Sequence, residues 1–224
     1  MSVPTELRAR IEADYEPVRP LPAPRVRAIS LLPLAALALL AAPTFFNVRS
    51  DAERIGWLLT WGASLGQVAL GFIVITAALR ESIPGRAWST AALAAWIVIP
   101  FVLLTAITFT TSELSQISLQ RGWWLVGLVC VGGSAATALP IVALANVLAA
   151  RAYPTRPAIA GLLLGVGAGL MADAGWRLFC HFGEPSHVLT AHVGGVVLAA
   201  LSSAALAIRL KPDTTSESLG GVRL

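Results

Sequence analysis

The chain has 224 residues, of which 56% are hydrophobic and 12% charged, and its mean hydropathy is +0.75. These values exclude an ordinary soluble domain and are typical of a membrane protein. The net charge of +4 and the pI near 9.8 would suggest nucleic acid binding in a soluble protein. In a membrane protein, however, the basic residues must first be assigned to one side of the bilayer.

The segment before the first span has two parts. Residues 5–15 can form a short helix with Leu7, Ile11 and Tyr15 on one side. Residues 16–25 contain four prolines, which enforce an extended path. A helix too short to be stable alone, joined to a membrane by a stiff spacer, is typical of a ligand for a groove on a partner protein. The alternative is a disordered leader whose basic residues only set the topology.

Six apolar segments are long enough to cross a bilayer, because a hydrocarbon core of about 30 Å requires roughly 20 residues of helix. They are Ala28–Phe46, Gly56–Leu79, Trp88–Thr110, Trp123–Ala149, Pro157–Leu178 and Val188–Ile208. The sequence therefore predicts an all-α, polytopic membrane protein with six transmembrane helices. Its expected parts are a cytoplasmic leader (1–27), a transmembrane domain (28–208) and a disordered cytoplasmic tail (209–224).

The basic residues indicate the orientation. With both termini in the cytoplasm, twelve of the sixteen Lys and Arg residues lie on the cytoplasmic side and four on the other side. This bias explains the basic pI without any nucleic acid. Pro33 and Pro43 interrupt the first apolar segment, and five further spans follow, so we expect a retained span rather than a cleaved signal peptide.

The fifth span contains small residues in a regular pattern. Gly161, Gly165 and Gly169 are spaced by four residues and predict a face on which another helix packs closely. Asp173 continues this face, and Arg177 follows it by four residues, so an ion pair between them is expected. Such a pair can also serve only to anchor the helix end.

The only two cysteines, Cys130 and Cys180, are expected on the outer side, at the start of span four and the end of span five. In an oxidising envelope compartment they could form a disulfide. They could instead bind Zn, Cu(I) or a Cd-like soft ion. Further ligands would come from His181, His187, His192 and Glu184. The plainer reading of each cysteine is a small buried apolar residue, and that of each histidine is an interfacial polar residue. His187 and His192, five residues apart, do not fall squarely on one face of an α-helix.

The chain resembles a known family. The leader sequence Glu16-Pro-Val-Arg-Pro-Leu-Pro-Ala-Pro is similar to the Pro-Val-x-x-Leu-x-Pro-Pro segment of the NrsF family (negative regulator of sigma F), six-span anti-sigma factors of the bacterial inner membrane. The connector Pro154-Thr-Arg-Pro157 with Ala160-Gly161, and the positions of Cys130 and Cys180, are also similar. The resemblance extends over nearly the whole chain.

The resemblance implies that the leader binds an extracytoplasmic-function sigma factor, and that Cys130 and Cys180 sense metal or oxidative stress. The expected partner-binding residues are Leu7, Ile11, Tyr15, Val18, Arg19 and Leu21. No cofactor is expected beyond a transient heavy-metal ion at the cysteines, and neither enzymatic activity nor direct nucleic acid binding is expected. The alternative functions are a small transporter or channel, which would need a polar pathway, and a structural subunit of a membrane complex.

Overall fold

The computed structural model describes residues 4–13, 20–115 and 123–210, and these residues form helices with no strand. Six helical segments are long and apolar enough to span a membrane, which confirms the predicted all-α, six-span fold. They are Pro24–Phe46, Trp57–Glu81, Thr90–Ser112, Trp124–Ala150, Pro157–Phe179 and Pro185–Arg209. Their bounds differ from the expected ones by at most a few residues.

The first and last spans are each built from more than one helical segment. The first comprises α2 (Pro24–Ile29) and α3 (Leu32–Phe46). The last comprises α9 (Pro185–His187), the π-helical turn η1 (Val188–His192) and α10 (Val193–Arg209). The other spans are α5 (Trp57–Glu81), α6 (Thr90–Ser112), α7 (Trp123–Ala150) and α8 (Pro157–Phe179), and a short helix, α4 (Ala52–Ile55), precedes α5.

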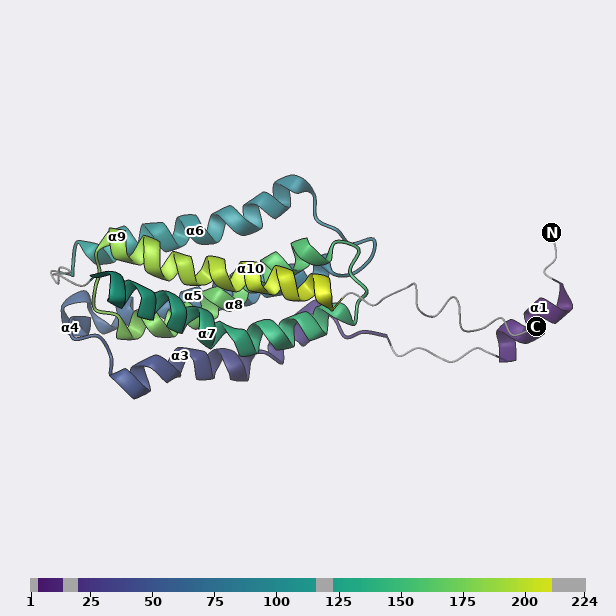
Figure 1. Cartoon of the computed structure of the whole chain (residues 1–224), viewed down its shortest axis with the longest axis horizontal. Helices are drawn as coiled ribbons and strands as arrows, with labels where there is room; N and C mark the ends of the chain where they lie inside the picture. Colours follow the sequence, from purple (N-terminus) through teal and green to yellow (C-terminus); the bar gives the residue numbers. More distant parts are fainter. Residues whose placement is uncertain (1–3, 14–19, 116–122, 211–224) are drawn as a thin grey trace.

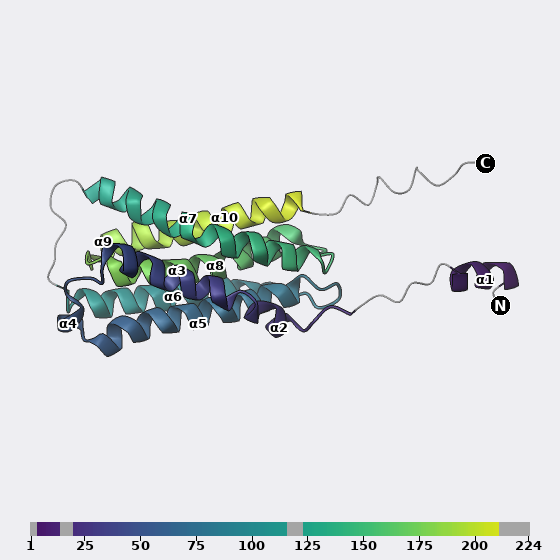
Figure 2. The ribbon, with the colours of Figure 1, turned by 90° about the horizontal axis from the view of Figure 1, so that it is seen from below.

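Helix α8 is the centre of the bundle, and α3, α5, α7 and α10 pack around it (Figures 1 and 2). Glycine and alanine residues along α8 explain this position, because they allow neighbouring backbones to approach closely. A Cβ atom on Gly167 would lie 2.7 Å from the Gly71 carbonyl oxygen of α5. Helix α6, by contrast, is the least buried span, so it is the helix most open to lipid.

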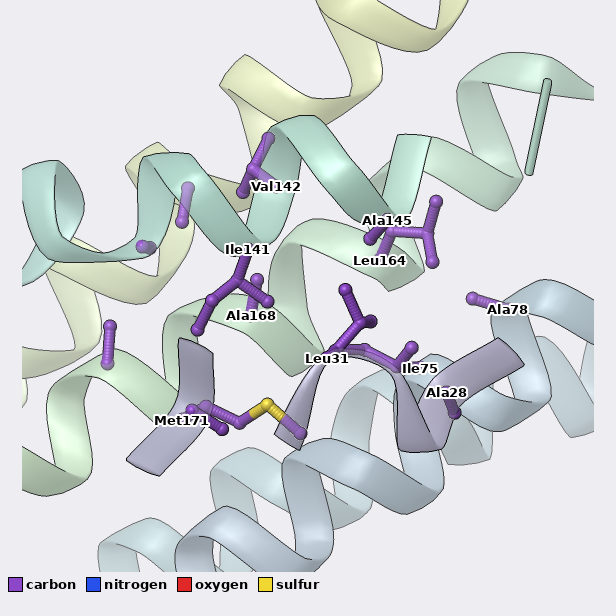
Figure 3. Close-up of a cluster of buried hydrophobic side chains, with 14 of the residues drawn as sticks. Ala28, Leu31, Ile75, Ala78, Ile141, Val142, Ala145, Leu164, Ala168 and Met171 are labelled. Carbon is purple, nitrogen blue, oxygen red and sulfur yellow. The ribbon is translucent and has the colours of Figure 1, made fainter. Parts of the chain in front are cut away.

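The hydrophobic core joins α8 to the first span and to α5 and α7. Leu31, Ile75, Ile141, Leu164 and Met171 are buried and lie together in this core (Figure 3). The two cysteines lie outside this core, in a separate small cluster with Ala191.

The first span begins and the last span ends at the same end of the bundle (Figure 1). We call this the leader end; Pro24, the end of α5 and Arg209 lie there. The opposite end, which we call the thiol end, contains α4 and the loop that follows α8. The assignment of the leader end to the cytoplasm remains a prediction from the distribution of basic residues.

Part of the leader is helical, as expected: α1 covers Thr5–Ala13. The chain is not helical at residues 20–23 and becomes helical again at Pro24, since proline is favoured in the first turn of a helix. Leu21 is partly exposed. The other expected partner-binding residues, and the tail from Lys211, fall outside the described side chains. These other residues are Leu7, Ile11, Tyr15, Val18 and Arg19.

Candidate metal and redox centre

The two cysteines lie together at the thiol end, from two adjacent helices. Cys130 lies in the first third of α7, and Cys180 is the residue at which α8 ends. Their sulfur atoms are 3.9 Å apart, and both residues are buried and free of a disulfide. Gly133 of α7 allows this close approach. The Trp176 indole of α8 occupies the position where a side chain at residue 133 would lie.

His187 and His192 join the cysteines from the start of the last span. The His187 Nε2 atom lies 3.3 Å from the Cys180 sulfur, and the centroids of the two imidazole rings are 5.6 Å apart. The expectation that these histidines do not share a helical face is wrong, because the chain forms a π-helical turn at this point. The Val193 N–H donates to the Val188 carbonyl, five residues earlier, and a five-residue turn brings positions i and i+5 together.

Together these four residues fit a tetrahedral metal site. One ligand atom from each of Cys130, Cys180, His187 and His192 lies within 4.8 Å of the others, and all four residues are buried. Zinc bonds of about 2.3 Å to sulfur and about 2.0–2.1 Å to nitrogen, at tetrahedral angles, place two sulfurs about 3.8 Å apart and a sulfur and a nitrogen about 3.6 Å apart. The observed separations of 3.9 and 3.3 Å are close to these values.

A buried polar network holds His192 in place. Its Nδ1 atom lies 2.7 Å from Asp173 Oδ1, and Gln67 donates to the other carboxylate oxygen at 2.8 Å. Because a carboxylate accepts, Nδ1 of His192 is the donor, and Nε2 is left as the ligand atom. The sequence predicted an ion pair between Asp173 and Arg177. In the structure the Asp173 carboxylate pairs with His192 instead. The Arg177 guanidinium donates to Thr108 on α6.

The thiols have access to the surroundings through a hollow of about 290 Å³. Leu125, Phe179 and His181 are among its lining residues, together with both cysteines. The Cys130 thiol donates to Cys180 and lowers the pKa of the Cys180 thiol; burial opposes this effect, and His187 adds to it. Cys180 is the cysteine that lies beside the His187 imidazole, and both cysteines line the hollow.

The structure separates the expected metal ligands into two groups. His187 and His192 belong to the cluster, whereas His181 and Glu184 do not. The His181 ring packs on Phe182, with their centroids 4.3 Å apart, at the edge of the hollow. The backbone carbonyl of Glu184 accepts a hydrogen bond from Val188 and begins the helical segment that carries the two ligand histidines.

The three spaced glycines of α8 lie against α10. A Cβ atom on Gly161 would lie 2.6 Å from the Ala207 side chain, and one on Gly169 would lie 2.9 Å from the Val196 Cα atom. A Cβ atom on Gly165 would overlap the backbone of Ala199 and Ala200. This contact fixes the helix that ends at Cys180 against the helix that follows His192.

Sequence reasoning missed a contact at the leader end. Arg27, at the start of the first span, is buried and donates to the Leu79 carbonyl at the end of α5 and to the Leu148 carbonyl at the end of α7. The expected first span began at Ala28, so Arg27 was counted with the leader. In the structure the span begins at Pro24, and a charge buried inside a span needs partners.

One of three comparisons with known proteins identifies a family. The family model NrsF, described as negative regulator of sigma F, matches residues 12–211. The chain matches no curated protein sequence and no solved structure. Because the family match extends from the leader to the end of the last span, the chain belongs to the NrsF family, the negative regulators of sigma F.

Proposed function

We propose that this protein holds an extracytoplasmic-function sigma factor at the cytoplasmic face of the bacterial inner membrane. The leader, residues 5–25, would bind the sigma factor, and a change at Cys130 and Cys180 would release it. Family membership supports the negative regulation of a sigma factor. The observation that carries the sensing half of the proposal is the convergence of two thiols and two imidazoles in one buried cluster.

The cluster can respond to two chemical signals. In oxidation, both thiols lose their protons, a sulfur–sulfur bond forms, and the oxidant takes up two electrons. The sulfurs must then approach from 3.9 Å to about 2.05 Å. A soft metal ion would instead be held by Cys130, Cys180, His187 and His192 near their present separations, and it would supply strong bonds to both thiolates. Oxidation therefore draws α7 and α8 together, whereas metal binding joins them to the last span.

A continuous path connects this cluster to the leader. Helix α7 runs without a break from Cys130 to its last turn, where the Leu148 carbonyl accepts a hydrogen bond from Arg27. Arg27 lies three residues after Pro24, where the first span begins. A displacement of α7 therefore reaches the root of the leader. Release counts as regulation only if the two thiol states differ in their affinity for the sigma factor, and a tenfold change requires about 1.4 kcal/mol of coupling.

A reporter gene under the control of the partner sigma factor tests the sensing half. Cys130→Ser and Cys180→Ser should each abolish induction by cadmium and by oxidant, because each removes one sulfur of the pair. His181→Ala is the matched control, since it changes the lining of the same hollow but no cluster ligand. Unchanged induction in both serine variants would remove the sensing role.

The same reporter tests the binding half. Leu7→Asp or Ile11→Asp should leave the reporter fully active without any stress, because a charge on the expected apolar side of α1 prevents capture of the sigma factor. Ala9→Asp places the same charge two residues from Leu7, on the other side of the helix, and should leave repression intact. Repression by all three variants would show that α1 is not the binding element.

A further inference from the structure

A groove lies at the leader end, far from the thiol cluster. It has a volume of about 420 Å³ and is bordered by the start of α2, the end of α5 and the first half of α6. Phe72, Ile73 and Trp96 form its apolar wall. Ile73 is 49% exposed, and α6 is the least buried span, so the groove is open to the hydrocarbon of the bilayer.

The groove carries positive charge where it meets the membrane surface. Arg25, Arg80 and Arg86 line it, and none of the described residues in its lining carries a carboxylate. The Arg80 guanidinium lies 3.7 Å above the Trp88 ring, and its Nη1 atom is buried without a hydrogen-bond partner among the described residues. Such an unpaired buried donor is costly and indicates an anion that completes the site.

The neighbouring acidic residue does not neutralise these arginines. Both carboxylate oxygens of Glu81 are engaged, one by Arg156 at 2.5 Å and the other by the Trp88 backbone N–H at 2.6 Å. Arg156 is the partner that balances Glu81. The three groove arginines thus remain available to a ligand with negative charge.

We propose that this groove binds an anionic phospholipid. The headgroup phosphate would contact Arg25, Arg80 and Arg86, and an acyl chain would lie along Phe72, Ile73 and Trp96. A free anion would leave the apolar wall unused, and a zwitterionic lipid would bring its own cation close to three arginines. Basic pockets between transmembrane helices at the membrane surface favour anionic lipids for this reason. Because Arg25 belongs to the root of the leader, the lipid fixes the point at which the leader leaves the bilayer.

Quenching of tryptophan fluorescence by brominated lipids tests this assignment on the full chain in phosphatidylcholine nanodiscs. A tenth of the lipid is replaced by phosphatidylglycerol or phosphatidylcholine with brominated acyl chains. We expect stronger quenching by the brominated phosphatidylglycerol, and Trp96→Phe should remove most of the excess. Arg25→Gln with Arg86→Gln should weaken the preference for phosphatidylglycerol roughly fivefold for each arginine removed. Arg80→Gln, which removes one arginine of the groove, should weaken this preference about fivefold.

The matched control is Arg209→Gln, which removes an arginine at the same end of the bundle but outside the groove. It should keep the preference. Equal quenching by the two brominated lipids, or an equal loss in Arg209→Gln, would overturn the proposal in favour of general surface attraction. Loss of quenching on addition of inorganic phosphate, or of a peptide of residues 1–22, would overturn it in favour of a free anion or of the leader itself.

Discussion

At the scale of single residues, the two histidines distinguish the two signals that we propose for the cluster. A disulfide needs only Cys130 and Cys180, whereas a four-coordinate metal site also needs His187 and His192. His187 is the better residue to change, because its Nδ1 atom has no hydrogen-bond partner among the described residues. His192 is tied to Asp173, so its loss would also disturb the buried carboxylate.

We therefore predict that His187→Gln separates metal sensing from oxidant sensing. The variant should bind cadmium at least about 100-fold more weakly, because loss of a direct ligand costs more than the 10–100-fold typical of outer-shell changes. The thiolate-to-cadmium absorption band measures this binding in the purified protein. Disulfide formation, followed by thiol labelling, should remain.

The control for this prediction is His181→Gln, the same substitution at a histidine outside the cluster. It should bind cadmium as the unchanged protein does. If His187→Gln bound cadmium with full affinity, the ion would be held by the sulfurs without the imidazoles. If it also lost the ability to form the disulfide, His187 would act on the thiols rather than on the metal.

At the scale of elements, the hydrophobic pattern was sufficient to find six spans, because each apolar run has the length that a bilayer requires. It could not find the π-helical turn at residues 188–192. That turn adds one residue to a helical repeat, and apolar periodicity carries no signal for it in a helix surrounded by lipid and protein. The partner of Asp173 was missed as well, because that partner, His192, is the last residue of this turn.

The contact between α8 and α10 is the element on which the cluster geometry depends. We predict that Gly165→Val destabilises the protein by about 1–3 kcal/mol, the usual cost of overpacking, because the new side chain would overlap the Ala199 and Ala200 backbone. The separation of α10 from α8 should also weaken cadmium binding, although Gly165 is far along α8 from the thiols. Thermal unfolding in detergent and the cadmium titration measure the two effects.

Gly66→Val is the matched control, because the space around Gly66 is open and this position lies on α5, away from α10. Its unfolding temperature should change less, and its cadmium affinity should not change. A Gly165→Val protein with normal stability and normal cadmium affinity would mean that α10 can shift without disturbing His192.

At the scale of the whole molecule, the packed spans that run from the thiol end to the leader end are the physical link between the two ends. The glycine-rich central helix and the hydrophobic core join all spans, but Arg27 is the residue that ties the root of the leader to both α5 and α7. Its two hydrogen bonds also satisfy carbonyls at helix ends, where the backbone lacks partners. Under the proposed function, Arg27 would carry a shift of α7 to the root of the leader, and it lies outside the cluster of thiols and imidazoles.

We predict that Arg27→Lys separates sensing from release. Lysine keeps the charge but cannot donate from a planar fork to two carbonyls at once, so the leader should lose its link to α7. Cadmium binding and disulfide formation at the thiol end should match the unchanged protein. Induction of the sigma-factor reporter by either signal should fall by about tenfold, equivalent to about 1.4 kcal/mol of lost coupling.

The control is Arg25→Lys, the same substitution at an exposed position of α2, which should retain full induction. Full induction in Arg27→Lys would show that the signal leaves the thiol end by another path, whereas loss of cadmium binding would show that Arg27 holds the whole bundle together rather than linking its two ends.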